Sequence, residues 1–294
     1  MTEAPTANAN AAARASTGKA PTTWNVLTDG DPTSVVLAAD FDASSRAEAR
    51  FTDFVGHLGG GLTVWETVPQ AVATRPDLPA EAYVKQWTDE VRASGRTVRA
   101  ILGFCAGSVY AAALAREVEA WQGSFPLTVL FDPERASAAS MYWQFHKAVD
   151  QMTPTLGPAE TGAAQDAGQR AQEDSPNLSD LARRLLLIYH SVAGKAFDKL
   201  GLDAARRAEL TETAGAFLSY LATAEQIEPL PAWRRSTVIT SATPTSGLNA
   251  LRALHPGQFD DLPAEELRFD VAHVDLLRTP EIAGAVSRLI TDRT

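Results

Sequence analysis

Short apolar runs alternate with amphipathic segments between residues 34 and 132. Each apolar run has the length of a buried strand, and each longer segment repeats its apolar residues at helical spacing. The predicted strands are 34–41, 62–68, 97–104 and 126–132, and the predicted helices are 44–60, 79–95 and 106–123. This alternation is typical of a mostly parallel sheet with helices on both faces, so the sequence predicts an α/β fold.

The alternation stops in the middle of the chain. Residues 135–230 are predicted to form helices, with a polar loop at 153–177 and no strand-like run. Strand patterns return at 236–242 and 266–272, and a predicted helix over 279–290 follows them. A sheet domain that is interrupted by a helical insertion explains this order of elements.

These elements imply one folded domain after an unstructured start. The first residues are rich in Ala, Thr, Pro and Asn and show no periodicity, which predicts a disordered tail over 1–23. The domain then spans 24–294, and its insertion at 135–230 is predicted to be a helical lid.

Composition narrows the class of protein. A chain of 294 residues with 45% hydrophobic and 21% charged residues is able to bury a full core. A net charge of −10 without a long Lys/Arg run disfavours nucleic-acid and membrane partners, because both need a concentrated positive face. A single cysteine excludes an internal disulfide, and no apolar run approaches the roughly 20 residues that span a bilayer. Because the start also lacks an apolar signal-peptide segment, we expect a cytoplasmic protein.

The single cysteine lies where a predicted strand meets a predicted helix. Gly103-Phe104-Cys105-Ala106-Gly107 has the spacing of the G-x-S-x-G nucleophile elbow, with cysteine in the serine position. In such a turn the glycines avoid clashes across the bend, and the nucleophile is presented at the N-terminus of the helix. That position is expected to favour the reactive thiolate. The alternative interpretation is an inert, buried cysteine.

Partners for Cys105 follow later in the chain. His273 comes after the last predicted strand, where a loop at the carboxyl edge of the sheet would bring an imidazole to the thiol. Asp132 ends the strand that follows the nucleophile helix and would orient this imidazole. Asp270 and Asp275 are closer to His273 in sequence, but one lies in the predicted strand and the other beyond it. We therefore predict a catalytic triad of Cys105, Asp132 and His273.

These motifs resemble those of the thioesterase family of α/β-hydrolases that serves nonribosomal peptide and polyketide synthases. The matching features are "GFCAGS", the aspartate at the end of the next strand, the helical insertion and "AHVDLL" near the C-terminus, within 24–294. The resemblance implies an α/β-hydrolase fold in which Cys105, Asp132 and His273 are nucleophile, acid and base. One departure is the nucleophile, because most of the family use serine.

A second departure concerns the oxyanion hole. The segment "VVLAADFDASS" lacks the Pro/Gly-rich turn that usually supplies the first oxyanion-hole amide in this family. By position, the resemblance implies that the Phe41 N–H would be that donor. The Ala106 N–H would be the second donor, and it follows directly from the elbow geometry.

The resemblance also implies a substrate class. It indicates natural-product biosynthesis, with substrates carried as thioesters on the phosphopantetheine arm of an acyl or peptidyl carrier protein. A cysteine nucleophile forms a new thioester, so the captured group stays activated, and some cysteine-bearing members of this family transfer acyl or aminoacyl groups. We therefore expect Cys105 to accept such a group and pass it to a second thiol or amine. The alternatives are an editing or releasing thioesterase that uses water, an esterase, and a non-catalytic binding protein.

The sequence predicts no cofactor or metal ion bound by the protein itself. Its histidines lack cysteine or histidine neighbours at helical spacing, as zinc sites often require. It also lacks a glycine-rich phosphate-binding motif.

Overall fold

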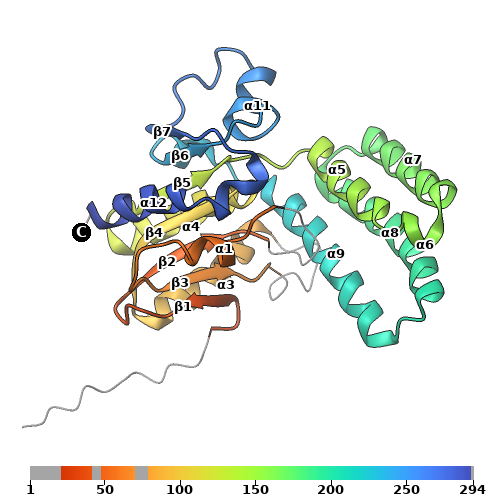
Figure 1. Ribbon diagram of the computed structural model, residues 1–294, viewed down its shortest axis with the longest axis horizontal. Helices are drawn as coiled ribbons and strands as arrows, with labels where there is room; N and C mark the ends of the chain where they lie inside the picture. The colour runs from red at the N-terminus through yellow and green to blue at the C-terminus, as the bar shows by residue number, and fades with distance from the viewer. Residues whose placement is uncertain (1–20, 42–47, 70–78, 293–294) are drawn as a thin grey trace, which may run out of the picture.

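The computed structural model describes residues 21–41, 48–69 and 79–292. In this part of the chain, seven strands form one sheet (Figure 1). The strands are β1 (Trp24–Thr28), β2 (Ser34–Ala39), β3 (Val64–Thr67), β4 (Thr97–Phe104), β5 (Leu127–Phe131), β6 (Thr237–Thr240) and β7 (Glu265–Arg268). Their spatial order is β1-β3-β2-β4-β5-β6-β7, and every neighbouring pair is parallel except β1 with β3. The prediction of a mostly parallel sheet is confirmed. The strand β1, however, was not predicted from the hydrophobic pattern.

Both faces of the sheet are covered by helices. All six residues of β2 are buried, and alternate residues belong to different hydrophobic clusters. Val35 and Leu37 pack in the cluster that includes α3 (Ala80–Ser94) and α4 (Gly107–Gln122). Val36 and Ala38 pack in the cluster that includes α1 (Phe51–Val55) and α12 (Pro280–Asp292). The strand is therefore apolar along its whole length, which is why the sequence shows a continuous run.

The insertion forms a separate group of helices beside the sheet (Figure 1). Its helices are α5 (Ala138–Asp150), α6 (Thr153–Leu156), α7 (Pro158–Asp174), α8 (Leu178–Leu200) and α9 (Ala204–Ala224). The short helix α10 (Leu230–Trp233) then leads back to β6. The prediction of a polar loop at 153–177 is wrong, because α6 and α7 occupy nearly all of this segment.

The sequence of α7 explains this error. Its buried positions are Thr161, Ala164, Gly168 and Ala171, which recur at helical spacing but carry small side chains. A Cβ on Gly168 would lie 2.5 Å from the ring of Phe145, so the two helices approach closely there. A stripe of small residues buries a helix face without producing the strong apolar signal from which helices are predicted.

Two other segments differ from the sequence prediction. The helix expected over 44–60 begins only at Phe51, because Arg50 has an extended backbone and its N–H bonds the Asp53 carboxylate at 2.9 Å. Residues 42–47 of that segment lie outside the described residues. The helix α11 (Gly247–Leu254) was not predicted.

The predicted disordered tail falls mostly outside the described residues. Of the segment 1–23, the structure describes only residues 21–23. Thr22 and Thr23 donate hydrogen bonds from both backbone and side chain to the Glu90 carboxylate on α3. These bonds attach residues 22 and 23, just before the predicted start at Trp24, to the sheet domain.

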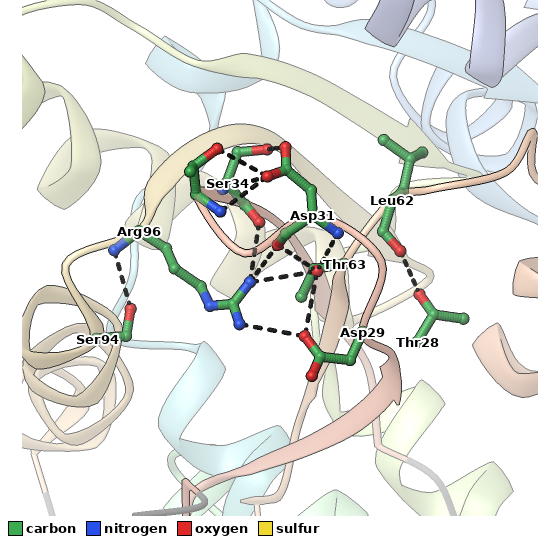
Figure 2. A network of polar contacts seen from close by, with 9 residues as sticks. Thr28, Asp29, Asp31, Ser34, Leu62, Thr63, Ser94 and Arg96 are labelled. Carbon is green, nitrogen blue, oxygen red and sulfur yellow. Dashed lines mark hydrogen bonds and ion pairs between the residues drawn. The ribbon is translucent and has the colours of Figure 1, made fainter. Parts of the chain in front are cut away.

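A polar network joins the amino ends of the central strands (Figure 2). The Asp31 carboxylate accepts hydrogen bonds from Ser34 Oγ at 2.5 Å and from Thr33, and these bonds hold the pKa of Asp31 below its ordinary value. The Arg96 guanidinium bonds the Asp31 carbonyl and pairs with Asp29 at 3.1 Å. These contacts stabilise the amino-terminal edge of the parallel strands. The candidate site lies at the opposite edge, where the strands end at their carboxyl termini.

Candidate active site

Cys105 occupies a strained turn between β4 and α4. Its φ is +50°, in the left-handed region that a residue with a side chain seldom adopts. A Cβ on Gly103 would lie 2.7 Å from Ser108 Cα, and one on Gly107 would lie 2.1 Å from the Ala39 carbonyl oxygen. Because the backbone segments are so close, only glycine fits on either side of the cysteine. This is the geometry that the G-x-C-x-G spacing predicted.

Asp132 follows the carboxyl end of β5 and is fully buried. It also has a positive φ, +41°, which directs the backbone sharply out of the strand. Its Oδ1 accepts the Ser241 N–H at 3.0 Å, and its Oδ2 lies 2.8 Å from Nδ1 of His273. Gly247, at the start of α11, lets this carboxylate pack closely, since a Cβ there would lie 2.6 Å from Asp132 Cα.

His273 follows β7, as the sequence predicted, and it begins the short 3-10 helix η1 (His273–Arg278). Its N–H donates to Thr243 Oγ1 at 2.8 Å, and its ring stacks on Phe104 with centroids 4.9 Å apart. The Asp132 carboxylate accepts the hydrogen bond from Nδ1, so Nε2 is the nitrogen that remains to exchange a proton with a neighbouring group. The position of His273 is therefore fixed by contacts of its backbone N–H, of one face of its ring and of one ring nitrogen.

The three predicted residues lie together at the carboxyl edge of the sheet. Cys105 Sγ, a ring nitrogen of His273 and a carboxylate oxygen of Glu134 all lie within 4.8 Å of one another. Asp132 adjoins this group through His273. The alternative acid Asp275 instead forms an ion pair with Arg278 at 3.4 Å.

The electrostatics of Cys105 differ from the sequence expectation. Burial raises the pKa of the thiol well above its ordinary value, and the negative charges of Glu134 and Asp40 raise it further. The Ala106 N–H donates a hydrogen bond to the sulfur and lowers the pKa of the thiol, but by less than the other causes raise it. The N-terminal amide of the helix thus favours the thiolate, as expected, but burial and the two carboxylates outweigh its effect on the pKa. A neutral thiol must give up its proton when it attacks.

The two amides expected in the oxyanion hole have different surroundings. The Ala106 N–H lies at the sulfur, on the first turn of α4. The Phe41 N–H donates to the Asp40 carboxylate at 2.7 Å. The backbone of Asp40 passes beside the elbow, because a Cβ on Gly107 would lie 3.1 Å from its Cα. Phe41 is thus near the turn, but its N–H is engaged by its own neighbour.

Glu134 is the residue that sequence reasoning missed. Its N–H donates to the Cys105 carbonyl at 3.2 Å, and its carboxylate accepts the Gly247 N–H at 3.2 Å. The motif "FDPE" contains this residue two positions after the predicted acid, but nothing in the sequence shows that the chain returns to the cysteine there. Among the described residues, the side chains of Cys105, Glu134 and His273 are also those with donor atoms close enough to share a metal ion.

The fold has counterparts among solved structures. The Vlm2 thioesterase domain, with genetically encoded 2,3-diaminopropionic acid bound with a dodecadepsipeptide, is 15% identical with a TM-score of 0.51, over 91% of this chain and 97% of that chain. MGS-M2, an α/β hydrolase enzyme from a Medee basin deep-sea metagenome library, is 10% identical with a TM-score of 0.52, over 92% of this chain and 94% of that chain. The chain has the α/β-hydrolase fold.

A longer protein contains the same fold as one part. The four-domain nonribosomal peptide synthetase holo-AB3403, bound to AMP and glycine, is 13% identical with a TM-score of 0.52. The match covers 92% of this chain and 20% of that chain, so this chain spans about a fifth of that synthetase. No protein-family model and no curated protein matches the sequence. Among the described residues, the helices are too short or too polar to cross a membrane.

Proposed function

We propose that the protein is a thioesterase-like acyltransferase that carries its acyl group on Cys105. The observation that carries this proposal is the position of the Cys105 sulfur, within 4.8 Å of a His273 nitrogen while Asp132 holds Nδ1 of the same ring. That arrangement groups a nucleophile, a base and a residue that orients the base, and it supports nucleophilic catalysis once the sulfur and the nitrogen come within hydrogen-bonding distance. The substrate is an acyl or aminoacyl thioester on the phosphopantetheine arm of a carrier protein.

The first half-reaction transfers the acyl group to the enzyme. His273 Nε2 accepts the thiol proton as the sulfur of Cys105 attacks the thioester carbonyl carbon. The Ala106 N–H stabilises the resulting oxyanion, and the Phe41 N–H joins it once it leaves the Asp40 carboxylate. The carbon–sulfur bond to the pantetheine arm then breaks, and the arm leaves as a thiol with the proton from His273.

The second half-reaction follows the same path in reverse with a new acceptor. An incoming thiol or amine gives a proton to His273 and attacks the acyl-Cys105 carbonyl carbon. The Cys105 sulfur leaves and recovers the proton. Since the acyl-enzyme is itself a thioester, the energy of the substrate bond is kept for this transfer, which favours transfer over hydrolysis as the proposed role.

The test is a single-turnover experiment with an acylated carrier protein. We expect intact-protein mass spectrometry to detect one acyl group on the wild-type chain and none on Cys105→Ala. His273→Ala should lower the loading rate by at least about a thousandfold. His255→Gln, which changes a histidine that contacts Phe259 instead, should load at the wild-type rate.

A chase step separates transfer from hydrolysis. The acyl-enzyme is mixed with an unloaded second carrier protein, and both the second carrier and the free acid are measured. Acyl transfer to the second carrier supports the proposal. Release of free acid alone would show the editing or releasing thioesterase, and the absence of any adduct would contradict both roles.

A further inference from the structure

Glu134 places a carboxylate beside the nucleophile, where the triad does not need one. Asp132 already holds Nδ1 of His273, at 2.8 Å. A carboxylate oxygen of Glu134 nevertheless lies within 4.8 Å of both Cys105 Sγ and the imidazole. The side chain is partly exposed and bonded to the Gly247 N–H, so it faces the site from a fixed position.

The negative charge of Glu134 opposes the chemistry proposed for Cys105. A carboxylate next to a developing thiolate repels it, and this charge raises the pKa of the thiol. Among the described residues, no lysine or arginine forms an ion pair with Glu134. The nearest basic residue in sequence, Arg135, pairs with Glu228 at 3.4 Å instead. Within the described part of the chain, no lysine or arginine at the site therefore offsets the carboxylate, and His273 becomes positively charged only when it has accepted the thiol proton.

A positively charged substrate group at this position would remove the conflict. In an aminoacyl thioester the α-nitrogen is about 2.5 Å from the carbonyl carbon, from ordinary bond lengths and angles. A carbonyl carbon about 3 Å from the sulfur, as attack requires, leaves the α-ammonium within hydrogen-bonding reach of an oxygen that lies within 4.8 Å of that sulfur. Desamino and N-acylated groups lack this charge.

We propose that the Glu134 carboxylate binds the α-ammonium of an aminoacyl group, so that the substrate is an aminoacyl thioester with a free amine. This inference rests on the proposed function and narrows its substrate class. The ammonium pairs with Glu134 and at the same time reduces the repulsion that the carboxylate exerts on the Cys105 sulfur. Binding of the correct substrate thereby helps to activate the nucleophile.

The first experiment compares alanyl-pantetheine with propionyl-pantetheine, which differ only in the amine. We expect wild-type Cys105 to load alanyl at least about tenfold faster, as one charge-assisted hydrogen bond would give. Glu134→Gln should slow alanyl loading by a similar factor and leave propionyl loading equal or faster. Glu228→Gln, which removes a carboxylate from the exposed pair with Arg135, should leave both rates unchanged. An equal loss with both substrates in Glu134→Gln would overturn the proposal.

A second measurement does not depend on thioester chemistry. Cys105 is the only cysteine, so its modification by a cationic and an anionic methanethiosulfonate (2-aminoethyl and 2-sulfonatoethyl) can be followed by mass. We expect the cationic reagent to react faster with the wild-type protein and this preference to decrease in Glu134→Gln. If the preference is found but no thioester loads, the ammonium site stands and the transferase function fails. If thioesters load without an effect of Glu134→Gln on either preference, the function stands and this inference fails.

Discussion

Two residues of the site hold backbone conformations that side chains usually avoid. Cys105 and Asp132 have φ values of +50° and +41°, and both directly follow central strands of the sheet. Such conformations persist only where the surrounding structure imposes them. Here Cys105 N–H donates to the Phe131 carbonyl at 2.9 Å, and Asp132 N–H donates to the Ile239 carbonyl at 2.9 Å. The hydrogen bonding of the sheet therefore continues one residue into each turn. It fixes the backbone positions of Cys105 and Asp132, from which their side chains project.

In the free protein, the thiol of Cys105 should lose its proton only at high pH. Burial, Glu134 and Asp40 raise the pKa of the thiol, so the thiolate fraction increases only at high pH. The rate of alkylation by iodoacetamide should therefore continue to rise above pH 9. Intact-protein mass measured over a pH series gives this rate for Cys105 alone. A rate that levels off near neutral pH would instead indicate a thiolate stabilised by His273.

At the scale of elements, the structure depends on glycines whose neighbours leave no room for a side chain. In α4 the close approach of Gly107 to Ala39 and Asp40 brings the turn at Cys105 against the end of β2. In α7 the close approach of Gly168 to Phe145 joins two helices of the insertion, α7 and α5. The first glycine was predicted from its motif, whereas the second has no motif and its role follows only from the packing.

Two glycine substitutions in α7 should have opposite effects on stability. Gly168→Ala places a Cβ 2.5 Å from a ring atom of the buried Phe145, so the free energy of unfolding should fall by about 1–3 kcal/mol. In Gly162→Ala the added Cβ would have no atom within 4 Å. The higher helix propensity of alanine should therefore raise the free energy of unfolding by about 0.5–1 kcal/mol. Urea unfolding of both variants measures the difference. Equal effects would show that α7 does not pack on α5 as described.

At the scale of the whole molecule, aromatic residues connect the helical insertion to the sheet domain. Tyr220 on α9 stacks on Tyr110 of α4 with ring centroids 4.3 Å apart and lies 5.5 Å from the ring of Phe41. Tyr110 Oη also donates to the Tyr220 carbonyl at 2.6 Å. The helix α9 of the insertion is therefore packed directly against α4 and against Phe41.

The two tyrosine hydroxyls at this junction should differ in their contribution to stability. Tyr220 Oη is buried and has no hydrogen-bond partner among the described residues, so Tyr220→Phe should leave the free energy of unfolding unchanged or raise it by about 1 kcal/mol. Tyr110→Phe removes the bond to the Tyr220 carbonyl and should lower it by about 1 kcal/mol. Thermal or urea unfolding tests this contrast. A marked loss of stability in Tyr220→Phe would reveal a partner for its hydroxyl.

The sequence by itself determined the local parts of this protein. Hydrophobic period distinguished strands from helices, and the spacing of Gly103, Cys105 and Gly107 indicated the elbow, because these properties depend on near neighbours in the chain. The order of elements also placed Asp132 and His273 at the correct edge of the sheet, since parallel strands end on one side.

Only the tertiary structure decided the electrostatics and the close packing. The pKa of Cys105 depends on burial and on Glu134 and Asp40, which reach the sulfur from different loops. The helix α7 depends on contacts of small residues with α5, which produce no strong pattern in the sequence. Both properties arise between segments that are distant in the chain, where charge and shape act through space and not along the sequence.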